Sequence, residues 1–246
     1  MSSRLLTCLF AATALLSVGC DDSTGPDDDE AANVRIVNAS SVVGELDVEV
    51  NGNVQTGASE VQFLNAGAQC VRVDADDPQL TLDQTGGTVT LPTTQNFSFT
   101  EGGRNTVIVS GTNATNLRIT TIDDPLTDRP DAGRARIRVV NARTITTPVD
   151  VHITPWNAAI GTVTEGVVSA HATTATSTNV VSAWVDVPAG GAIQVRVANA
   201  GATTTSIDIL NYVPRSGEEL TLVALDPAGG GTTGLRWILS PSCSGP

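Results

Sequence analysis

The chain has 246 residues, with 13 basic and 26 acidic side chains and a formal net charge of −13 at pH 7. This balance excludes a binder of phosphate backbones, which needs a basic face, so we expect no nucleic acid partner. Every basic residue is an arginine, which excludes a Schiff-base lysine, a Walker-type phosphate lysine and a Ser-Lys dyad.

Residues 1–19 have the layout of a secretory signal peptide. A short start carries a single charge, Arg4, and is followed by an uncharged, mostly apolar run, Leu5–Val18. As a helix this run would rise about 21 Å, which is short of the roughly 30 Å of a membrane core. We therefore expect a cleaved leader and no permanent membrane span.

Two kinds of cleavage fit this leader. The ordinary signal peptidase needs small residues, which Ser17 and Gly19 supply. Alternatively, Leu16–Cys20 resembles a bacterial lipobox, and the resemblance implies that Cys20 becomes the mature N-terminus and carries a diacylglyceryl group. We prefer the lipoprotein interpretation.

The segment 20–32 is predicted to be an acidic, disordered tether. Asp21–Glu30 holds six acidic residues, together with Ser, Thr, Gly and Pro, so it cannot bury apolar surface and repels itself into an extended form. It lacks the alternating D-x-D-x-D-G loop of a calcium site. A solvated tether explains it better than a metal site does.

The rest of the chain reads as strands. No amphipathic helix of ten or more residues is evident, and short β-branched runs such as "NVRIVN", "TVIVSG" and "ARIRVVNA" alternate with Gly, Pro, Asn and Asp. Several of these runs alternate apolar and polar residues, as half-buried strands do. Their spacing of roughly ten residues predicts an all-β fold of antiparallel sandwiches or barrels.

Five pairs of segments recur in the same order along the chain. The matched pairs are 34–39 with 137–142, 46–50 with 149–153, 66–67 plus 71–73 with 189–190 plus 195–197, 103 plus 107–109 with 217 plus 221–223, and 117–119 with 235–237. We infer two β-sandwich domains, 33–123 and 134–246, joined by the Pro- and Asp-rich linker 124–133.

The same residues carry a family resemblance. V-R-I-V-N-A (34–39), a D-V-x-V strand, an A-G turn and a V-R-V strand resemble the bacterial domain-of-unknown-function 4397 family. The resemblance covers both copies. It implies an exported or lipid-anchored protein, often with tandem domains and an immunoglobulin-like sandwich fold, and it supplies no activity and no site.

The cysteines allow one disulfide. Cys8 lies in the leader and Cys20 is assigned to lipid, which leaves Cys70 and Cys243 as an even pair in an exported protein. We favour a bond between them that fixes the angle between the two domains. The alternative is a buried, inert Cys70 and a free thiol at Cys243 in the tail.

Candidate chemistry is sparse, and we expect no catalytic residue and no cofactor. His152 is placed on a solvent-facing strand position and His171 in a loop, and neither belongs to a known catalytic motif. The loop with Asp74, Asp76 and Asp77 is a weak calcium candidate, although acidic hairpin loops are usually only solvated.

The aromatic residues offer one candidate for binding. The chain has three Trp, one Tyr and four Phe, which is few for a carbohydrate-binding face. Trp156 lies in an apparent loop and is the candidate exposed aromatic. Trp184 and Trp237 lie in runs that alternate apolar and polar residues, and we expect their side chains in the hydrophobic core.

Together these features predict a non-enzymatic, lipid-anchored protein of the bacterial cell envelope, facing the periplasm or the cell surface. Its expected role is binding, scaffolding or envelope structure. Its expected partners are the membrane, through the lipid anchor, and an envelope protein or polysaccharide. The alternative is an envelope hydrolase or a calcium-dependent adhesin with a non-standard site.

Overall fold

The computed structural model describes residues 30–87, 91, 97–124, 129–143, 149–160, 166–171, 180–199, 208–225 and 236–243. This part of the chain is all-β, as predicted, and contains no helix. In these ranges there is accordingly no helix long and apolar enough to cross a membrane. The predicted leader, Cys20 and the tether up to residue 29 lie outside the described residues.

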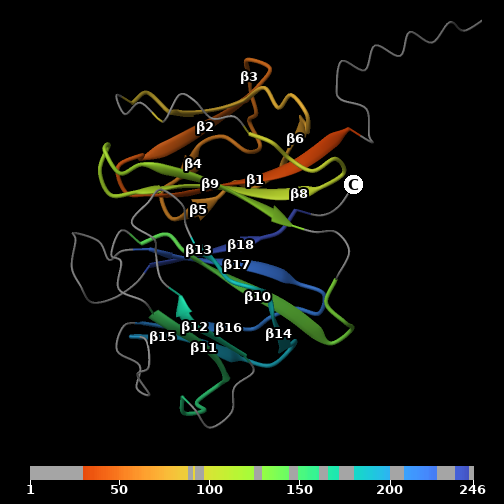
Figure 1. Cartoon of the computed structure of the whole chain (residues 1–246), viewed down its shortest axis with the longest axis vertical. Helices are drawn as coiled ribbons and strands as arrows, with labels where there is room; N and C mark the ends of the chain where they lie inside the picture. The colour runs from red at the N-terminus through yellow and green to blue at the C-terminus, as the bar shows by residue number, and fades with distance from the viewer. Residues whose placement is uncertain are drawn as a thin grey trace, which may run out of the picture.

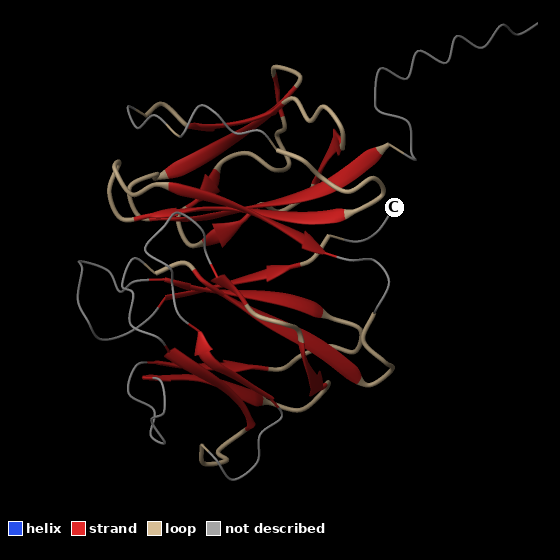
Figure 2. Cartoon of the chain, viewed as in Figure 1, coloured by secondary structure: helices blue, strands red, loops and turns tan. Residues whose placement is uncertain are grey.

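The strands form four sheets, which we call A, B, C and D. They lie as successive layers in the order B, A, C, D (Figures 1 and 2). Sheet A contains β1 (Ala31–Ser40), β5 (Asn65–Ala66), β6 (Val71–Asp74), β8 (Arg104–Gly111) and β9 (Arg118–Asp124). Sheet B contains β2 (Glu45–Val50), β3 (Asn53–Val54), β4 (Val61–Gln62) and β7 (Leu80–Gln84).

The second half of the chain supplies the other two layers. Sheet C contains β10 (Arg134–Asn141), β13 (Val180–Val181), β14 (Val185–Pro188), β17 (Glu219–Leu225) and β18 (Arg236–Pro241). Sheet D contains β11 (Val149–Pro155), β12 (Gly166–His171), β15 (Ile193–Asn199) and β16 (Asp208–Tyr212). β1 begins at Ala31, so the last two residues of the predicted tether, 31 and 32, belong to this strand.

Most strand pairs are antiparallel, with one exception in each five-stranded sheet. β1 runs parallel to β8, and β10 runs parallel to β17. The predicted antiparallel pairing is therefore confirmed for the other strand pairs and wrong for these two. Because all four strands of sheet B lie between β1 and β8 in the chain, their parallel pairing closes a long connection.

Three apolar clusters hold the layers together. One fills the space between sheets A and B and includes Ile36, Leu46 and Val107. A second fills the space between sheets C and D and includes Ile137 and Ile153. The third draws its residues from sheets A and C, so all four layers are packed on one another.

Sheets A and C are buried on both faces. All residues of β8 and β17 are buried, as are all but one in each of β1 and β10. Their alternating sequences predict half-buried strands, and this is wrong for these four because their polar face lies against the other sheet. β2 and β7, in the outer sheet B, do show the predicted alternation of burial.

The asparagine of the V-N-A motif has a structural role. The Asn38 amide donates to the backbone oxygens of Val43 at 3.0 Å and Val61 at 2.9 Å, and its side-chain oxygen accepts from the backbone of Ser40. Asn38 therefore satisfies the backbone where the chain leaves sheet A for sheet B. Asn141, which is also fully buried, accepts from the backbone of Arg143 at 3.3 Å.

The strand pairing separates the correct repeat matches from the incorrect ones. The pairs 34–38 with 137–141, 46–50 with 149–153 and, in the described part of the third match, 118–119 with 236–237 occupy equivalent strand positions. The match of 107–109 with 221–223 is wrong by one residue, because Val107 lies beside Ile36 and Leu222 beside the equivalent residue Val139.

The match of 71–73 with 195–197 is also wrong. β6 pairs with β1, whereas β15, which contains residues 195–197, pairs with β11. The equivalent of β6 is β14, which pairs with β10 in the same register. β6 and β15 both carry the sequence V-R-V although they occupy different positions in the fold. The prediction that the two halves are separate domains stays a prediction.

Candidate functional site

The facing sides of sheets A and C, which we call the sheet junction, hold most of the buried charge of the described chain. Val34 and Ile36 of β1 pack into the cluster between sheets A and B. Because side chains alternate along a strand, Arg35 and Val37 point to sheet C instead.

Each strand at the junction changes from polar to apolar along its length. The junction-facing residues, in chain order, are Arg35, Val37 and Ala39 in β1; Arg104, Thr106 and Ile108 in β8; Arg136, Arg138 and Val140 in β10; and Glu219, Thr221, Val223 and Leu225 in β17. The parallel pairing of β1 with β8 and of β10 with β17 brings the polar ends together. The junction is therefore divided into a charged half and an apolar half.

The apolar half is a cluster that both sheets supply. Its buried members from sheet A are Val37, Ala39, Ile108 and Ile122. Sheet C supplies Val140, Val223 and Leu225, together with Ala142, which directly follows β10. Burial of such side chains contributes about 25 cal/mol for each Å² removed from water. This cluster supplies the apolar contact between the two inner sheets.

Glu219 is the centre of one ion-paired group in the charged half. One carboxylate oxygen lies 2.6 Å from Arg104 of sheet A and the other lies 2.5 Å from Arg136 of sheet C. All three side chains are almost fully buried. A single carboxylate thus joins arginines from the two sheets.

Asp124 and Arg138 form a second buried ion pair across the junction. Thr106 donates to Asp124 at 3.2 Å, and Arg138 Nε donates to the Thr221 hydroxyl at 2.9 Å. Trp184 covers this group, with its ring centroid 4.5 Å from the Arg138 guanidinium. The face of the Trp184 ring attracts the guanidinium cations of Arg136 and Arg138, which adds to the stabilisation that the carboxylates provide.

Desolvation is the largest effect on both members of this pair. Burial raises the pKa of Asp124, and the charge of Arg138 and the Thr106 hydrogen bond oppose that rise. Burial lowers the pKa of Arg138, and Asp124 opposes that change. Removing either partner would leave a buried charge without compensation, which typically costs about 3–5 kcal/mol.

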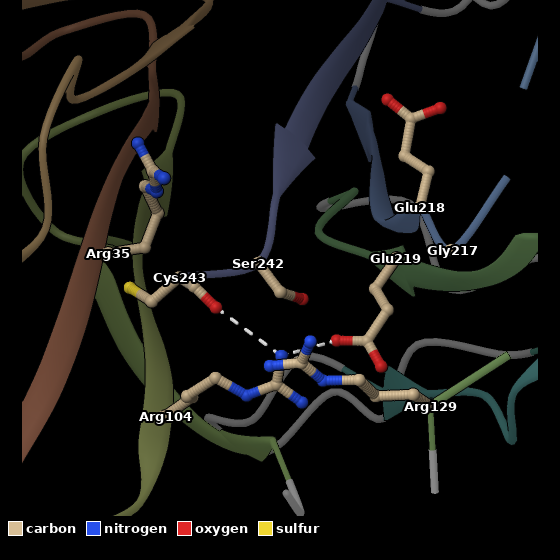
Figure 3. Close-up of a pocket in the computed structure, with 8 residues that line it drawn as sticks. All are labelled: Arg35, Arg104, Arg129, Gly217, Glu218, Glu219, Ser242 and Cys243. Carbon is tan, nitrogen blue, oxygen red and sulfur yellow. Dashed lines mark hydrogen bonds and ion pairs between the residues drawn. The ribbon is translucent and has the colours of Figure 1, made fainter. Parts of the chain in front are cut away.

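A cleft of about 320 Å³ lies beside the charged half (Figure 3). It is lined by Arg35, Arg104, Arg129, Gly217, Glu218, Glu219, Ser242 and Cys243. In Figure 3 the side chains of Arg104 and Arg129 extend toward one another from opposite sides. Arg104 also donates to the backbone oxygen of Cys243 at 3.3 Å.

The turn before β17 forms one wall of the cleft. Gly217 has a φ of 78°, a conformation that a side chain would strain, and its amide donates to the backbone of Arg134. Glu218 follows and accepts from the Tyr212 hydroxyl at 2.7 Å and from the backbone of Arg215 at 2.8 Å. These bonds turn the Glu218 carboxylate away from Glu219 and from the arginines of the cleft, as Figure 3 shows.

The predicted disulfide is confirmed. Cys70 and Cys243 are bonded, with their Cα atoms 6.0 Å apart. Cys70 directly precedes β6 of sheet A, and Cys243 follows β18 of sheet C. The bond therefore joins the two halves of the chain next to the cleft. The alternative, a free thiol at Cys243, is wrong.

The acidic loop after β6 satisfies its own backbone. Asp74 accepts from the amides of Asp76 at 2.9 Å and Asp77 at 3.0 Å, and Asp77 accepts from Gln79 at 2.7 Å. This is a local turn in which the Asp74 side chain replaces a backbone acceptor. Over the described ranges, no group of three or more His, Cys, Asp or Glu residues is placed to hold a metal ion.

The tryptophans and histidines differ in part from their predicted positions. Trp156 follows β11 and is 48% exposed. Trp184 is not in a strand core, because it lies between β13 and β14, half-buried on Arg136 and Arg138. Trp237 lies in β18, and its side chain lies outside what the structure describes.

His152 is buried, at 9% exposure, so its predicted solvent-facing position is wrong. β11 is a central strand, and His152 lies between Val167 of β12 and Arg196 of β15. Within the described residues neither ring nitrogen has a hydrogen-bond partner. His171 ends β12, and its side chain is outside the described part.

The residues of the charged half were missed by the sequence interpretation. The signal was present, because arginines recur at alternate positions of β10, in the "RARIRVV" stretch. Alternating charge usually marks a solvated face, and only the pairing of two sheets assigns these arginines to an interface.

A protein-family model described as a domain of unknown function (DUF4397) matches residues 32–152. These residues cover sheets A and B, β10 and the first part of β11. The match supports a domain of this family in that part of the chain, in agreement with the resemblance of the V-R-I-V-N-A motif. No curated protein matches the chain.

Loss of the disulfide should destabilise the folded chain. The bond closes a loop with a sequence separation of 173 residues, for which the chain-entropy model gives an upper contribution of about 5 kcal/mol. Cys70→Ser/Cys243→Ser should therefore unfold at clearly lower guanidinium concentration than the oxidised wild type. Alkylation of two thiols in the non-reduced protein, measured by mass, would contradict the bond.

Tyr212 should titrate at unusually high pH. Partial burial and the neighbouring Glu218 raise its pKa to about 12. The chain has a single tyrosine, so phenolate absorbance reports this group alone. The unfolded state loses this proton near pH 10 and the folded state keeps it, so the free energy of unfolding should fall as pH rises from 10 to 12.

Glu218→Gln tests the cause of that shift. Removing the negative charge should lower the midpoint of the Tyr212 titration toward 10, while Glu45→Gln, in sheet B, should leave it unchanged. A wild-type midpoint near 10 would show that the Tyr212–Glu218 contact does not persist in solution.

Proposed function

We propose that the chain is a non-enzymatic, lipid-anchored protein of the bacterial cell envelope with a binding, scaffolding or structural role. In this proposal it carries two immunoglobulin-like copies of the family domain, one in each half of the chain, behind a signal peptide and an acidic tether. The observation that carries the proposal is the sheet junction.

The junction supports a scaffolding role because it fixes the angle between the two halves by three independent means. These are the apolar cluster, the buried ion pairs and the Cys70–Cys243 bond. Contacts between domains of one chain are usually small and polar, and they permit relative motion. A protein that holds partners at a set separation benefits from a junction that does not bend.

The matching strand pairings support two copies of one domain. β1 pairs with β6 and β8, and β10 pairs with β14 and β17, with the same directions in both halves. The registers also agree, since Ala32 lies opposite Val73 and Ala135 lies opposite Val187. The family match itself extends across sheets A and B and into the second half.

The sequence of residues 1–32 and the disulfide support the envelope location. The leader and the lipobox-like segment support a lipid on Cys20, and the acidic composition of residues 21–30 suits a spacer that an anionic lipid surface repels. Disulfides form and persist outside the reducing cytoplasm. The membrane is thus the first partner, and an envelope protein or polysaccharide is the second.

The anchor is tested by fractionation of Cys20→Ala. The wild type should sediment with membranes and require detergent for release, whereas Cys20→Ala should be soluble or remain as an unprocessed precursor, because it has no acceptor for the lipid. Cys8→Ala, which changes a cysteine of the predicted leader, is the matched control and should stay in the membrane fraction. A wild type that is soluble without detergent would refute the anchor.

The scaffolding role is tested by capture from detergent-solubilised envelopes. Wild type and Cys20→Ala should retain the same stoichiometric partner, and Cys70→Ser/Cys243→Ser should retain less because its two halves are no longer covalently joined. Equal capture by the double variant would argue against a role for the fixed junction. Turnover of ester, amide or glycoside probes that His152→Ala abolishes would instead identify a hydrolase.

A further inference from the structure

Sheets A and C place equivalent residues opposite one another at the junction. Asn33 of β1 lies beside Arg104, and the equivalent Arg136 of β10 lies beside Glu219. Arg104 and Glu219 thus occupy the same position in the two sheets, and they meet as an ion pair at 2.6 Å. The junction therefore has an approximate twofold relation between its two sides.

On one side of this relation, Arg138 is fully partnered. It pairs with Asp124, donates from Nε to Thr221 and stacks on Trp184. Asp124 is supplied by the edge strand β9, at the position opposite Arg104. A buried arginine with a carboxylate, a hydroxyl and an aromatic ring around it has its charge compensated.

On the other side, the equivalent residues leave an arginine without a carboxylate. Arg35 is the equivalent of Arg138, since it lies beside Thr106 as Arg138 lies beside Thr221. Ser242 is the equivalent of Asp124, since it follows β18 next to Glu219 and donates its amide to the Glu219 backbone. A neutral serine stands where the first side has the counter-ion.

Arg35 is buried and only partly satisfied. It is 9% exposed, and it donates to the backbone oxygens of Gly67 at 2.6 Å and Ala68 at 3.3 Å. Its Nε and the Ser242 hydroxyl have no hydrogen-bond partner in the described chain. Burial, which lowers the pKa of Arg35, is not opposed by any carboxylate there.

The cleft lies where this missing carboxylate would be. Arg35 and Ser242 both line it, together with Arg104 and the exposed Arg129 (Figure 3). Its volume of about 320 Å³ is at the lower end of the range for small-molecule sites. The exposure of Arg129 and Gly217 opens it to solvent.

The charge of the cleft is opposite to that of the protein. Its lining has three arginines and two glutamates, and Glu219 is already shared with a further arginine, Arg136. The chain as a whole has a net charge of −13. A local positive excess in an acidic protein, with unused donors inside it, attracts an anion.

We propose that this cleft binds a small oxyanion, a phosphate or carboxylate group, which takes the place of the carboxylate that Asp124 supplies on the other side of the junction. The Ser242 hydroxyl donates to its inner oxygens, and Arg129 closes over the outer ones. The Arg35 guanidinium, which points away from both in Figure 3, adds its positive charge from the wall of the cleft. Guanidinium forks match the geometry of both oxyanions. The site is independent of the lipid anchor.

Titration calorimetry on the full chain tests the site, with inorganic phosphate in one arm and succinate in the other. Sodium chloride holds the ionic strength constant in both arms. Phosphate, succinate or both should bind saturably with one site per chain, and the tighter arm identifies the oxyanion. Arg129→Gln should weaken binding by about tenfold, as the loss of one charge-assisted hydrogen bond does. Arg72→Gln, which changes an exposed side chain of β6, is the matched control and should bind as the wild type.

Ser242→Asp tests the equivalence with Asp124. The new carboxylate should pair with Arg35, so the variant should lose saturable anion binding and melt higher than the wild type. Ser242→Asn, which is similar in size and uncharged, should not show the higher melting temperature. Absence of saturable binding in both arms, or unchanged affinity in both Arg129→Gln and Ser242→Asp, would overturn the proposal.

Discussion

The burial of both faces of sheets A and C is the constraint on which the rest of the structure depends. A strand that is covered on both sides can be apolar, or it can carry charges that ion pairs and hydrogen bonds compensate. The junction strands combine the two solutions along their length, with Glu219 and Asp124 balancing arginines in one half and a cluster around Ile108 in the other. A buried ion pair adds little net stability but penalises any arrangement that separates its members. The charged half therefore specifies the register of the two sheets, and the apolar half supplies the attraction.

The remaining elements follow from this middle contact. Sheets B and D cover the outer faces of A and C, and in sheet B the strands β2 and β7 have the half-buried pattern. The Cys70–Cys243 bond lies at the charged end of the junction, beside the cleft. At this end the packing is less apolar, and a covalent bond there opposes opening of the ion pairs to water.

The sequence predicts the all-β class, the family domain and the disulfide, because each depends on local pattern or on counting cysteines. It does not predict which face of a strand meets water. Arg138 and Arg72 both stand between valines or isoleucines in similar runs, yet Arg138 is buried at the junction and Arg72 is exposed. The difference arises from packing between residues more than a hundred positions apart. For the same reason, Val71–Val73 was aligned with the wrong strand, since pairing partners and not sequence letters distinguish β6 from β15.

The opposite charges of Arg104 and Glu219 at equivalent positions also bear on how the chain recognises itself. If sheet A of one molecule met sheet A of another in the same way, Arg104 would face Arg104, and two copies of sheet C would bring Glu219 against Glu219. Like charges brought together in a water-free contact disfavour both homotypic complexes by several kcal/mol. Only the pairing of one half with the other is electrostatically complementary. Charge reversal at a single repeated position thus makes a pair of similar surfaces selective for a heterologous match, which the chain satisfies internally.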